Sequence, residues 1–396
     1  MSDFLLDERL SGLRQRVRTF IDEDVIPAEP ALWADVQSGS TAGLRKLRAR
    51  ARAAGLWTPH LPVELGGQGL GMMGMCALFR EAGRSLFGAA ACNCDAPDQG
   101  NMDLLLSTAS PAVRERWLEP LCDGEITSAF CMTEPAPGAG ADPSNLRTRA
   151  SQDGEDWVIE GHKWYSTGGR DASFLIVMAR TSDDPRSGAT MFAVDRKAPG
   201  VEYVRDIPVM APPILAHREG EFRFHGVRVG PEAVLGEVGQ GFLLAQRRLV
   251  PARLTHCMRW LGLADRTMEI CREYLAKRVS FGRRLAEHQL VQLKLAENAT
   301  AIHAGNLMTL HCAWLMEQGQ DASGFSSMAK NHVANALCKT LDDAIQLHGG
   351  LGYSEDLPFT LWYRHARAAR IADGPDEVHV AKVASDFMRG RLGLLA

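Results

Sequence analysis

The sequence contains no run of eighteen apolar residues, and residues 1–16 are polar and charged. It therefore predicts neither a membrane-spanning helix nor a signal peptide, and a cytoplasmic location is expected. The chain also lacks an excess of one charge, because 44 Lys and Arg stand against 48 Asp and Glu, for a net charge of −4. This balance gives no reason to expect nucleic acid as a partner.

The nine cysteines show no spacing typical of a zinc site, and no metal is expected. Their odd number and scattered positions favour reduced, mostly buried thiols. The glycine-rich segment 66–71 is not a dinucleotide fingerprint, because no apolar strand precedes it and Pro62 lies close before it. Internal repeats and low-complexity tracts are absent too, so the 396 residues are expected to fold as two or three domains.

Three regions of different pattern follow one another along the chain. Residues 1–125 are mostly helical by apolar periodicity, residues 126–240 alternate short apolar runs with turn clusters, and residues 241–396 return to long helical periods. The first helix is expected to stop at Pro27. The middle region fits a small β barrel or sandwich and the last an antiparallel bundle, so these ranges are the expected domains.

The segment 372–379, Ala-Asp-Gly-Pro-Asp-Glu-Val-His, is the most informative one. Its Gly-Pro pair is expected to leave Asp373 in a tight turn between helical stretches at 366–371 and 376–388. A carboxylate at the tip of a turn can remove a proton from a carbon beside a carbonyl. The alternative is helix capping, because Pro375 suits the first helical position and the residues before it suit the cap. Locally, capping is the favoured interpretation.

Two segments of the middle region place glycine beside polar or aromatic residues. A strand expected at 127–135 leads into the small-residue loop 136–142, whose backbone N–H groups can approach a flat or anionic ligand. Residues 161–169 set Trp164 and Tyr165 beside hydroxyls and glycines, which suits stacking on a ring system. A β-hairpin with buried aromatics is the plainer interpretation of that segment.

Two segments of the last region are similar in character. Three arginines and a serine at 278–284 could bind phosphate near a helix start, and a solvated basic helix end explains them equally well. Residues 346–353 end a helix with three glycines, of which capping explains one.

Together these segments resemble the acyl-CoA dehydrogenase family over essentially the whole chain. Five motifs stand in the family's order: Pro62-x-x-x-Gly66-Gly67-x-Gly69, Thr133-Glu134-Pro135, Lys163 to Thr167, Arg278-x-x-Phe281-Gly282 with Gln289, and Gln346-x-x-Gly349-Gly350-x-Gly352. The resemblance implies an α+β multidomain protein with an N-terminal helical domain, a central β domain and a C-terminal four-helix bundle. It also implies FAD, bound between the domains and across a dimer interface.

The resemblance assigns roles to individual residues. Thr133 would lie near the flavin pyrimidine edge beside Met132, Tyr165 against the flavin face, and Thr167 near N5, the hydride acceptor. Arg253 would lie near the thioester arm, and Gly374 would contact substrate. The remaining cofactor contacts implied are Arg278, Ser280, Phe281 and Gln289 toward the neighbouring subunit's FAD, with Gln346, Gly349, Gly350, Pro375 and Glu377.

Asp373 falls where the family places its catalytic base, which is Glu in most members. The string 373–379, with the segments 91–102 and 256–259, resembles the aspartate-base branch that includes family members ten and eleven and bacterial relatives. The reaction implied is α,β-dehydrogenation of an acyl-CoA: Asp373 removes the α-proton and hydride passes to flavin N5. Burial would raise the pKa of Asp373 above ~3.9 while the helix start would favour the anion, and the sequence leaves that balance open.

Two departures from the family pattern concern the substrate. Ala141 stands where a Ser near the pantetheine arm is common, and residues 210–214 differ from the branch. The expected partners are an acyl-CoA, an electron-transfer flavoprotein as electron acceptor, and further copies in a homodimer or homotetramer. Alternatives are a flavin oxidase of the nitroalkane-oxidase type, which also uses an aspartate base, and a catalytically silent FAD- or acyl-CoA-binding subunit.

Overall fold

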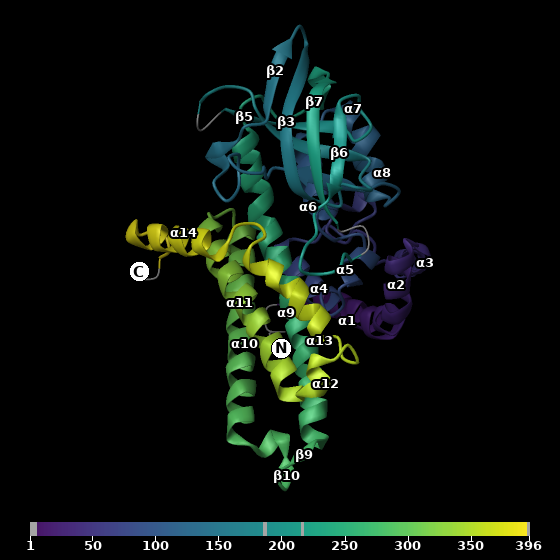
Figure 1. Cartoon of the computed structure of the whole chain (residues 1–396), viewed down its shortest axis with the longest axis vertical. Coiled ribbons are helices and arrows are strands. Elements are labelled where there is room, and N and C mark those ends of the chain that lie inside the picture. The colour runs from purple at the N-terminus through teal and green to yellow at the C-terminus, as the bar shows by residue number, and fades with distance from the viewer. Residues whose placement is uncertain (1–5, 185–187, 215–217, 394–396) are drawn as a thin grey trace.

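The computed structural model describes residues 6–184, 188–214 and 218–393, and it contains helical, strand and helical regions in that order (Figure 1). The strands of the middle region lie at one end of the long axis and the longest helices extend to the other, with the N-terminal helices packed beside them. This order confirms the expected fold class. The elements before residue 126 are α1 (Glu8–Phe20), η2 (Ile21–Val25), α2 (Ile26–Ser38), α3 (Ala42–Ala53), η3 (Val63–Leu65), α4 (Met72–Ala82), α5 (Gly88–Ala91), α6 (Asp98–Thr108), α7 (Pro111–Val113), η4 (Arg114–Leu118) and α8 (Glu119–Cys122).

The first helical stretch does not stop at Pro27, so that prediction was wrong. Helix α1 begins at Asp7, whose carboxylate accepts a hydrogen bond from the N–H of Leu10 at 2.7 Å. The chain then passes through the π-helical turn η2 directly into α2, which ends at Gly39. Proline cannot donate an N–H, and the wider π turn sits where an ordinary helical hydrogen bond would be lost.

The middle region is one eight-stranded mixed sheet in the order β6-β7-β3-β2-β4-β5-β8, with β1 paired parallel to β4. Both faces of β4 are buried, which explains its unbroken apolar run. One face packs against α6 and α8, and the other against aromatic residues of β3 and β7. The strands are β1 (Ser128–Cys131), β2 (Arg149–Asp153), β3 (Asp156–Thr167), β4 (Phe174–Arg180), β5 (Ala189–Asp195), β6 (Val201–Asp206), β7 (Glu219–Val229) and β8 (Val234–Leu235), with short 3-10 turns η5 (Pro143–Asn145) and η6 (Pro231–Ala233).

Long helices form the last region, and α9, α10 and α11 share one apolar core. Helix α4 of the first region packs directly on α9: a Cβ added at Gly262 would lie 1.9 Å from the carbonyl oxygen of Arg80. Only glycine permits that approach. The elements are α9 (Gly241–Lys277), β9 (Val279–Ser280), β10 (Arg283–Arg284), η7 (Leu285–Glu287), α10 (Gln289–Glu317), α11 (Ser323–His348), α12 (Gly350–Tyr353), α13 (Phe359–Ala366), η8 (Arg367–Arg370) and α14 (Asp376–Met388).

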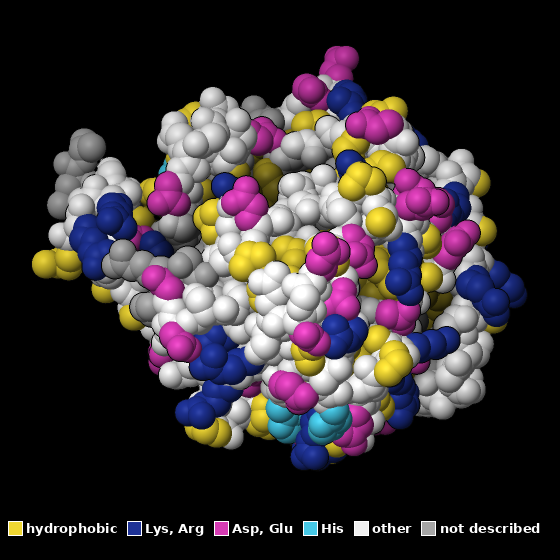
Figure 2. All heavy atoms as spheres, turned by 90° about the horizontal axis from the view of Figure 1, so that it is seen from above, with side chains coloured by type: hydrophobic (Ala, Val, Ile, Leu, Met, Phe, Trp, Pro, Cys, Tyr) yellow, Lys and Arg dark blue, Asp and Glu magenta, His cyan; other side chains and the backbone are white. Residues whose placement is uncertain are grey.

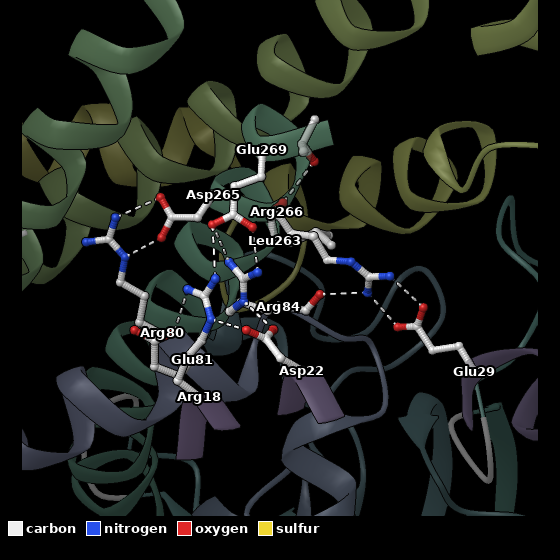
Figure 3. A network of polar contacts seen from close by, with 11 residues as sticks. Arg18, Asp22, Glu29, Arg80, Glu81, Arg84, Leu263, Asp265, Arg266 and Glu269 are labelled. Carbon is white, nitrogen blue, oxygen red and sulfur yellow. Dashed lines mark hydrogen bonds and ion pairs between the residues drawn. The ribbon is translucent and has the colours of Figure 1, made fainter. Parts of the chain in front are cut away.

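A network of charged side chains fastens α9 to the N-terminal helices (Figure 3). Arg80 reaches Asp265 with two nitrogens, at 2.7 and 2.9 Å, and the side chain of Arg84 is only 4% exposed beside Glu269. Paired groups of this kind avoid leaving a buried charge uncompensated. The other pairs of the network are Arg18–Asp22, Arg18–Glu269, Arg84–Asp22 and Arg266–Glu29.

The surface at the strand end carries interspersed acidic and basic side chains (Figure 2). Arg228 there lies between Asp153 and Asp156, and His225 lies 2.9 Å from Glu202. Among the described helices, none is both long and apolar enough to cross a membrane.

Candidate active site

Asp373 lies in the turn between η8 and α14, in the left-handed backbone region with φ +54°. It caps nothing: the residue before α14 is Pro375, and no side chain bonds the start of that helix. The capping interpretation was therefore wrong. Gly374 follows with φ +108°, and a Cβ there would come 2.9 Å from Nε2 of His379. A backbone held in this way at a non-glycine residue is sparsely populated and has to be supported by its surroundings.

Two cationic side chains hold this turn by its backbone. Arg253 Nε on α9 donates to the carbonyl oxygen of Asp373 at 3.0 Å. Lys330 Nζ on α11, with a fully buried side chain, donates to the carbonyl oxygen of Gly374 at 2.6 Å. Because both cations bind carbonyl oxygens, neither occupies the Asp373 carboxylate, which remains 22% exposed.

The carboxylate of Asp373 lies beside a histidine ring and two arginines. His256 Nε2 on α9 is 3.3 Å from Oδ2. Burial alone would raise the pKa of Asp373, but the contact with His256 and the charges of Arg248 and Arg253 lower it well below the ordinary range. The balance that the sequence left open is thus decided by side chains of α9, and Asp373 is an anion at neutral pH.

Three further titratable groups lie at the turn or beside Arg248. Burial lowers the pKa of Lys330. Burial, with the charges of Lys330 and Arg253, lowers the pKa of His379 to about 4, so that His379 is neutral at pH 7. Burial raises the pKa of Asp103 on α6 to about 7, against the opposing charge of Arg248. Arg248 therefore lies near two carboxylates, Asp373 with a lowered pKa and Asp103 with a raised one.

The ends of β1 and β3 bring together the motif at Thr133-Glu134-Pro135 and the motif from Lys163 to Thr167. Lys163 Nζ donates to the carbonyl oxygen of Met132 at 3.0 Å, and the backbone N–H of Trp164 donates to that of Thr133 at 3.0 Å. Lys163 also lies 2.8 Å from Glu134, with 0% and 3% of the two side chains exposed. The carboxylate of Glu134 accepts three backbone N–H groups as well, those of Ala139, Arg147 and Thr148.

A bulge between Lys163 and Ser166 in the β3–β7 pairing turns Tyr165 outward. Tyr165 has φ +51° and is 46% exposed, which an aromatic ring in a plain hairpin core would not be. The hydroxyl of Thr167 donates to Glu219 at 2.9 Å, so its oxygen keeps its acceptor capacity. Met132, Thr133, Tyr165 and Thr167 thus lie at one edge of the sheet.

Apart from Pro375 and Glu377, the remaining predicted cofactor residues lie toward the far end of α9. Arg278 ends that helix, Ser280 belongs to the two-stranded β9–β10 hairpin, and Phe281 at the hairpin tip is 95% exposed. Gln289 opens α10, while Gln346, Gly349 and Gly350 surround the end of α11. A cavity of about 430 Å³ is lined by Arg278 together with His348 and Leu351, so these two segments adjoin.

The structure therefore separates the predicted residues into distinct groups. Arg248 joins the sheet edge to the Asp373 turn, because its guanidinium lies 4.1 Å from the ring centre of Phe130 on β1. Arg278, in contrast, lies 25 residues beyond Arg253 on the same helix, about 37 Å away at 1.5 Å per residue. Pro375 and Glu377 lie at the start of α14 with Asp373.

Four residues near Asp373 carried no assigned role in the sequence: Arg248, His256, Lys330 and His379. One of them had a usable signal, since His256 is three positions after Arg253 and shares its helix face. Lys330 is 43 positions before Asp373 and on another helix, so no local pattern connects them.

Three family models match consecutive parts of the chain. They are "Acyl-CoA dehydrogenase, N-terminal domain" at residues 7–125, "Acyl-CoA dehydrogenase, middle domain" at residues 129–226 and "Acyl-CoA dehydrogenase, C-terminal domain" at residues 239–388.

Two curated relatives match nearly the whole chain. The protein "Probable acyl-CoA dehydrogenase FadE2" of Mycobacterium tuberculosis is 38% identical over 398 residues, covering 96% of both chains. Human "Acyl-CoA dehydrogenase family member 11" is 36% identical over 391 residues, covering 94% of this chain and 50% of its own length. The chain thus spans about half the length of that human relative.

Solved structures agree with these matches. A Mycobacterium abscessus structure superposes with a TM-score of 0.91 at 37% identity, covering 97% of this chain and 98% of its own. Butyryl-CoA dehydrogenase from Megasphaera elsdenii superposes with a TM-score of 0.86 at 25% identity, covering 98% and 100%. The FAD complex of PigA, at 21% identity and a TM-score of 0.88 over 98% and 99% of the two chains, shows the same fold.

Proposed function

The chain belongs to the acyl-CoA dehydrogenase family, and on this premise we propose that it oxidises an acyl-CoA thioester to the 2-enoyl-CoA with Asp373 as the base. The observation that carries the proposal is the way in which the turn is held. Arg253 and Lys330 bind its backbone carbonyl oxygens, so the carboxylate remains ionised and available to a substrate. A base needs both properties.

The residues at the sheet edge and at the end of α11 fit FAD. Tyr165 offers an exposed aromatic face, and Trp164 Nε1 is buried without a hydrogen-bond partner in the described part of the chain. A Cβ built at Gly349 or Gly350 meets no atom within 4 Å, which leaves room for a ligand to approach the backbone. Met132, Thr133, Tyr165 and Thr167 would hold the ring system. When bound, FAD supplies the acceptor for the β-hydride.

The chain's own contribution is to position the base and hold the proton. Asp is one methylene shorter than Glu, so the left-handed backbone at Asp373 and its anchoring by α9 and α11 bring the carboxylate toward the substrate. The cations that lower the pKa of Asp373 weaken it as a base. The same positive field stabilises the enolate-like negative charge that develops on the thioester.

The arrangement also supports the partners proposed. Arg278 and Phe281 lie too far along α9 from Asp373 to serve the same FAD molecule, so we propose that they contact the cofactor of a second copy. A homodimer or homotetramer and an electron-transfer flavoprotein complete the proposal. We also propose domain boundaries at 1–125, 126–240 and 241–396, and the cytoplasm as the location.

The test is anaerobic flavin bleaching by a panel of acyl-CoAs. The wild-type protein is expected to bind FAD and bleach, while Asp373→Asn keeps FAD and acyl-CoA but bleaches about 10²- to 10⁴-fold more slowly. Asp356→Asn, on an exposed loop, is the matched control and should behave as wild type.

Three results would contradict the proposal. Asp373→Asn bleaching at the wild-type rate would remove Asp373 as the base. Bleaching by nitroalkanes alone would point to the oxidase, and a protein that binds no FAD would point to a silent subunit.

A further inference from the structure

Three side chains of one helix face and one turn form a line that ends at the carboxylate of Asp373. His256 Nε2 lies 3.3 Å from Oδ2 of Asp373, and the other ring nitrogen, Nδ1, lies 3.0 Å from Arg259 NH2. The ring is also stacked on Trp260, with centres 5.3 Å apart and planes 22° apart. The imidazole is therefore fixed in both position and rotation.

Arg259, at one end of this line, determines which ring nitrogen of His256 carries a proton. A guanidinium has donors only and stays charged, so Nδ1 of His256 must accept from Arg259 with its lone pair. The single ring proton then sits on Nε2, which faces Asp373. A second proton on Nδ1 would point into a cation and lose this contact.

Arg259 is itself held in place. Its NH1 donates to the carbonyl oxygen of Cys94 at 3.3 Å and lies 3.6 Å from Asp95, and its guanidinium lies 5.7 Å from the ring centre of Phe79. These partners come from α4 and from the segment before α6, so the N-terminal region fixes the cation that faces the histidine.

We propose that Arg259 holds His256 as the neutral Nε2–H tautomer, and that His256 in turn holds Oδ2 of Asp373, which leaves Oδ1 to take the α-proton. This rests on the proposed function of Asp373. His256 and Arg259 are positioning residues: the Cα–H bond breaks toward Oδ1, the proton stays on Asp373, and His256 keeps the proton it already has.

Charged and titratable groups from several elements lie around the His256–Asp373 pair. The groups near the pair are Arg248, Arg253, Cys257 and Arg259 on α9, Lys330 on α11 and His379 on α14, with Asp95 before α6 beside Arg259. The ring of His256 thus lies between the guanidinium of Arg259 and the carboxylate of Asp373.

The first experiment reads the tautomer directly and does not depend on catalysis. Nitrogen-15 NMR of the histidine-labelled protein, with the His256 signal assigned by comparison with His256→Gln, should show a neutral ring with its proton on Nε2 at pH 7.5. An imidazolium, or a proton on Nδ1, would overturn the proposal. In Arg259→Met, Nδ1 is free, and the ring should gain a second proton as the pH is lowered.

The second experiment separates positioning from mere packing. His256→Leu should bind acyl-CoA normally and lose about tenfold to hundredfold in bleaching rate, while His256→Gln, which keeps an N–H donor, should recover most of it. Arg259→Met should show a falling rate at low pH that the wild type lacks. Equal rates for His256→Leu and wild type would sink this inference alone, whereas full activity of Asp373→Asn would sink the proposed function.

Discussion

Two turns of this molecule each combine a carboxylate with a fully buried lysine, but the lysine has a different partner in each. After β1, Lys163 pairs with the side chain of Glu134 at 2.8 Å. Before α14, Lys330 bonds the backbone carbonyl oxygen of Gly374 at 2.6 Å and leaves the neighbouring Asp373 carboxylate without a lysine. Both carboxylates have a lowered pKa, Glu134 to about 2, so charge alone does not distinguish them.

The two carboxylates differ in how many hydrogen-bond partners already occupy their oxygen atoms. Every oxygen of Glu134 is occupied by Lys163 or by backbone N–H groups, and the residue fixes the loop beside Met132 and Thr133. Asp373 is fixed through its main chain, and its side chain has one close partner, His256. A lysine that binds a carboxylate side chain forms a structural ion pair. A lysine that binds a backbone carbonyl oxygen instead positions the turn and leaves the neighbouring carboxylate available.

The largest expected effect on stability is at the turn after β1, where Lys163 pairs with Glu134. Lys163→Met leaves Glu134 buried without its counter-charge and should lower the free energy of unfolding by about 3–5 kcal/mol, measured by denaturant titration. The exposed Lys197→Met is the control and should change it by less than about 0.5 kcal/mol. Equal unfolding midpoints for both variants would show that the Glu134–Lys163 pair does not hold its loop.

At the Asp373 turn, replacing the lysine should reduce activity more than stability. Lys330→Met replaces a buried cation with an apolar side chain of similar length, so the free energy of unfolding should fall by less than about 2 kcal/mol. The bleaching rate should fall by about tenfold to hundredfold because the turn loses an anchor. Lys46→Met, on the exposed face of α3, is the control. If Lys330→Met lost as much stability as Lys163→Met and kept the wild-type bleaching rate, the proposed difference between the two lysines would be wrong.

A third carboxylate, Asp103, has no lysine partner, and its effect should appear only in the pH dependence of stability. No Lys or Arg nitrogen lies within ion-pair distance of it among the described residues, and burial raises its pKa to about 7. Between about pH 4 and 7 the folded state keeps a proton that the unfolded state has lost, so stability falls as the pH rises through that window.

Asp103→Asn should remove this decline, on the order of 2 kcal/mol, in unfolding titrations at pH 5 and 8. Asp342→Asn, on an exposed position of α11, should leave the decline in place. A decline that persists in Asp103→Asn would mean that another group causes it.

Local sequence predicted some of this site well. The Gly-Pro break put the start of the last helix at Asp376, where the structure has it, and it placed Asp373 in the turn. It failed at Pro27, because a π-helical turn absorbs the missing donor. Local sequence could not predict that Lys330 and Arg248 lie at the turn, because their contacts with it arise only when α9 and α11 pack together. The outward Tyr165 depends on a bulge that the strand pattern does not show.

Helix α9 is an unbroken helix of 37 residues that contacts the Asp373 turn through Arg253 and ends at the Arg278 hairpin. In the proposed assembly, each chain therefore contributes to two reaction centres without completing either one. When a chain damaged in the hairpin pairs with a chain damaged in the turn, both defects fall on the same centre of the pair. The other centre of the mixed pair then remains intact. Two inactive variants mixed together would therefore regain activity, because each reaction centre is built from two chains.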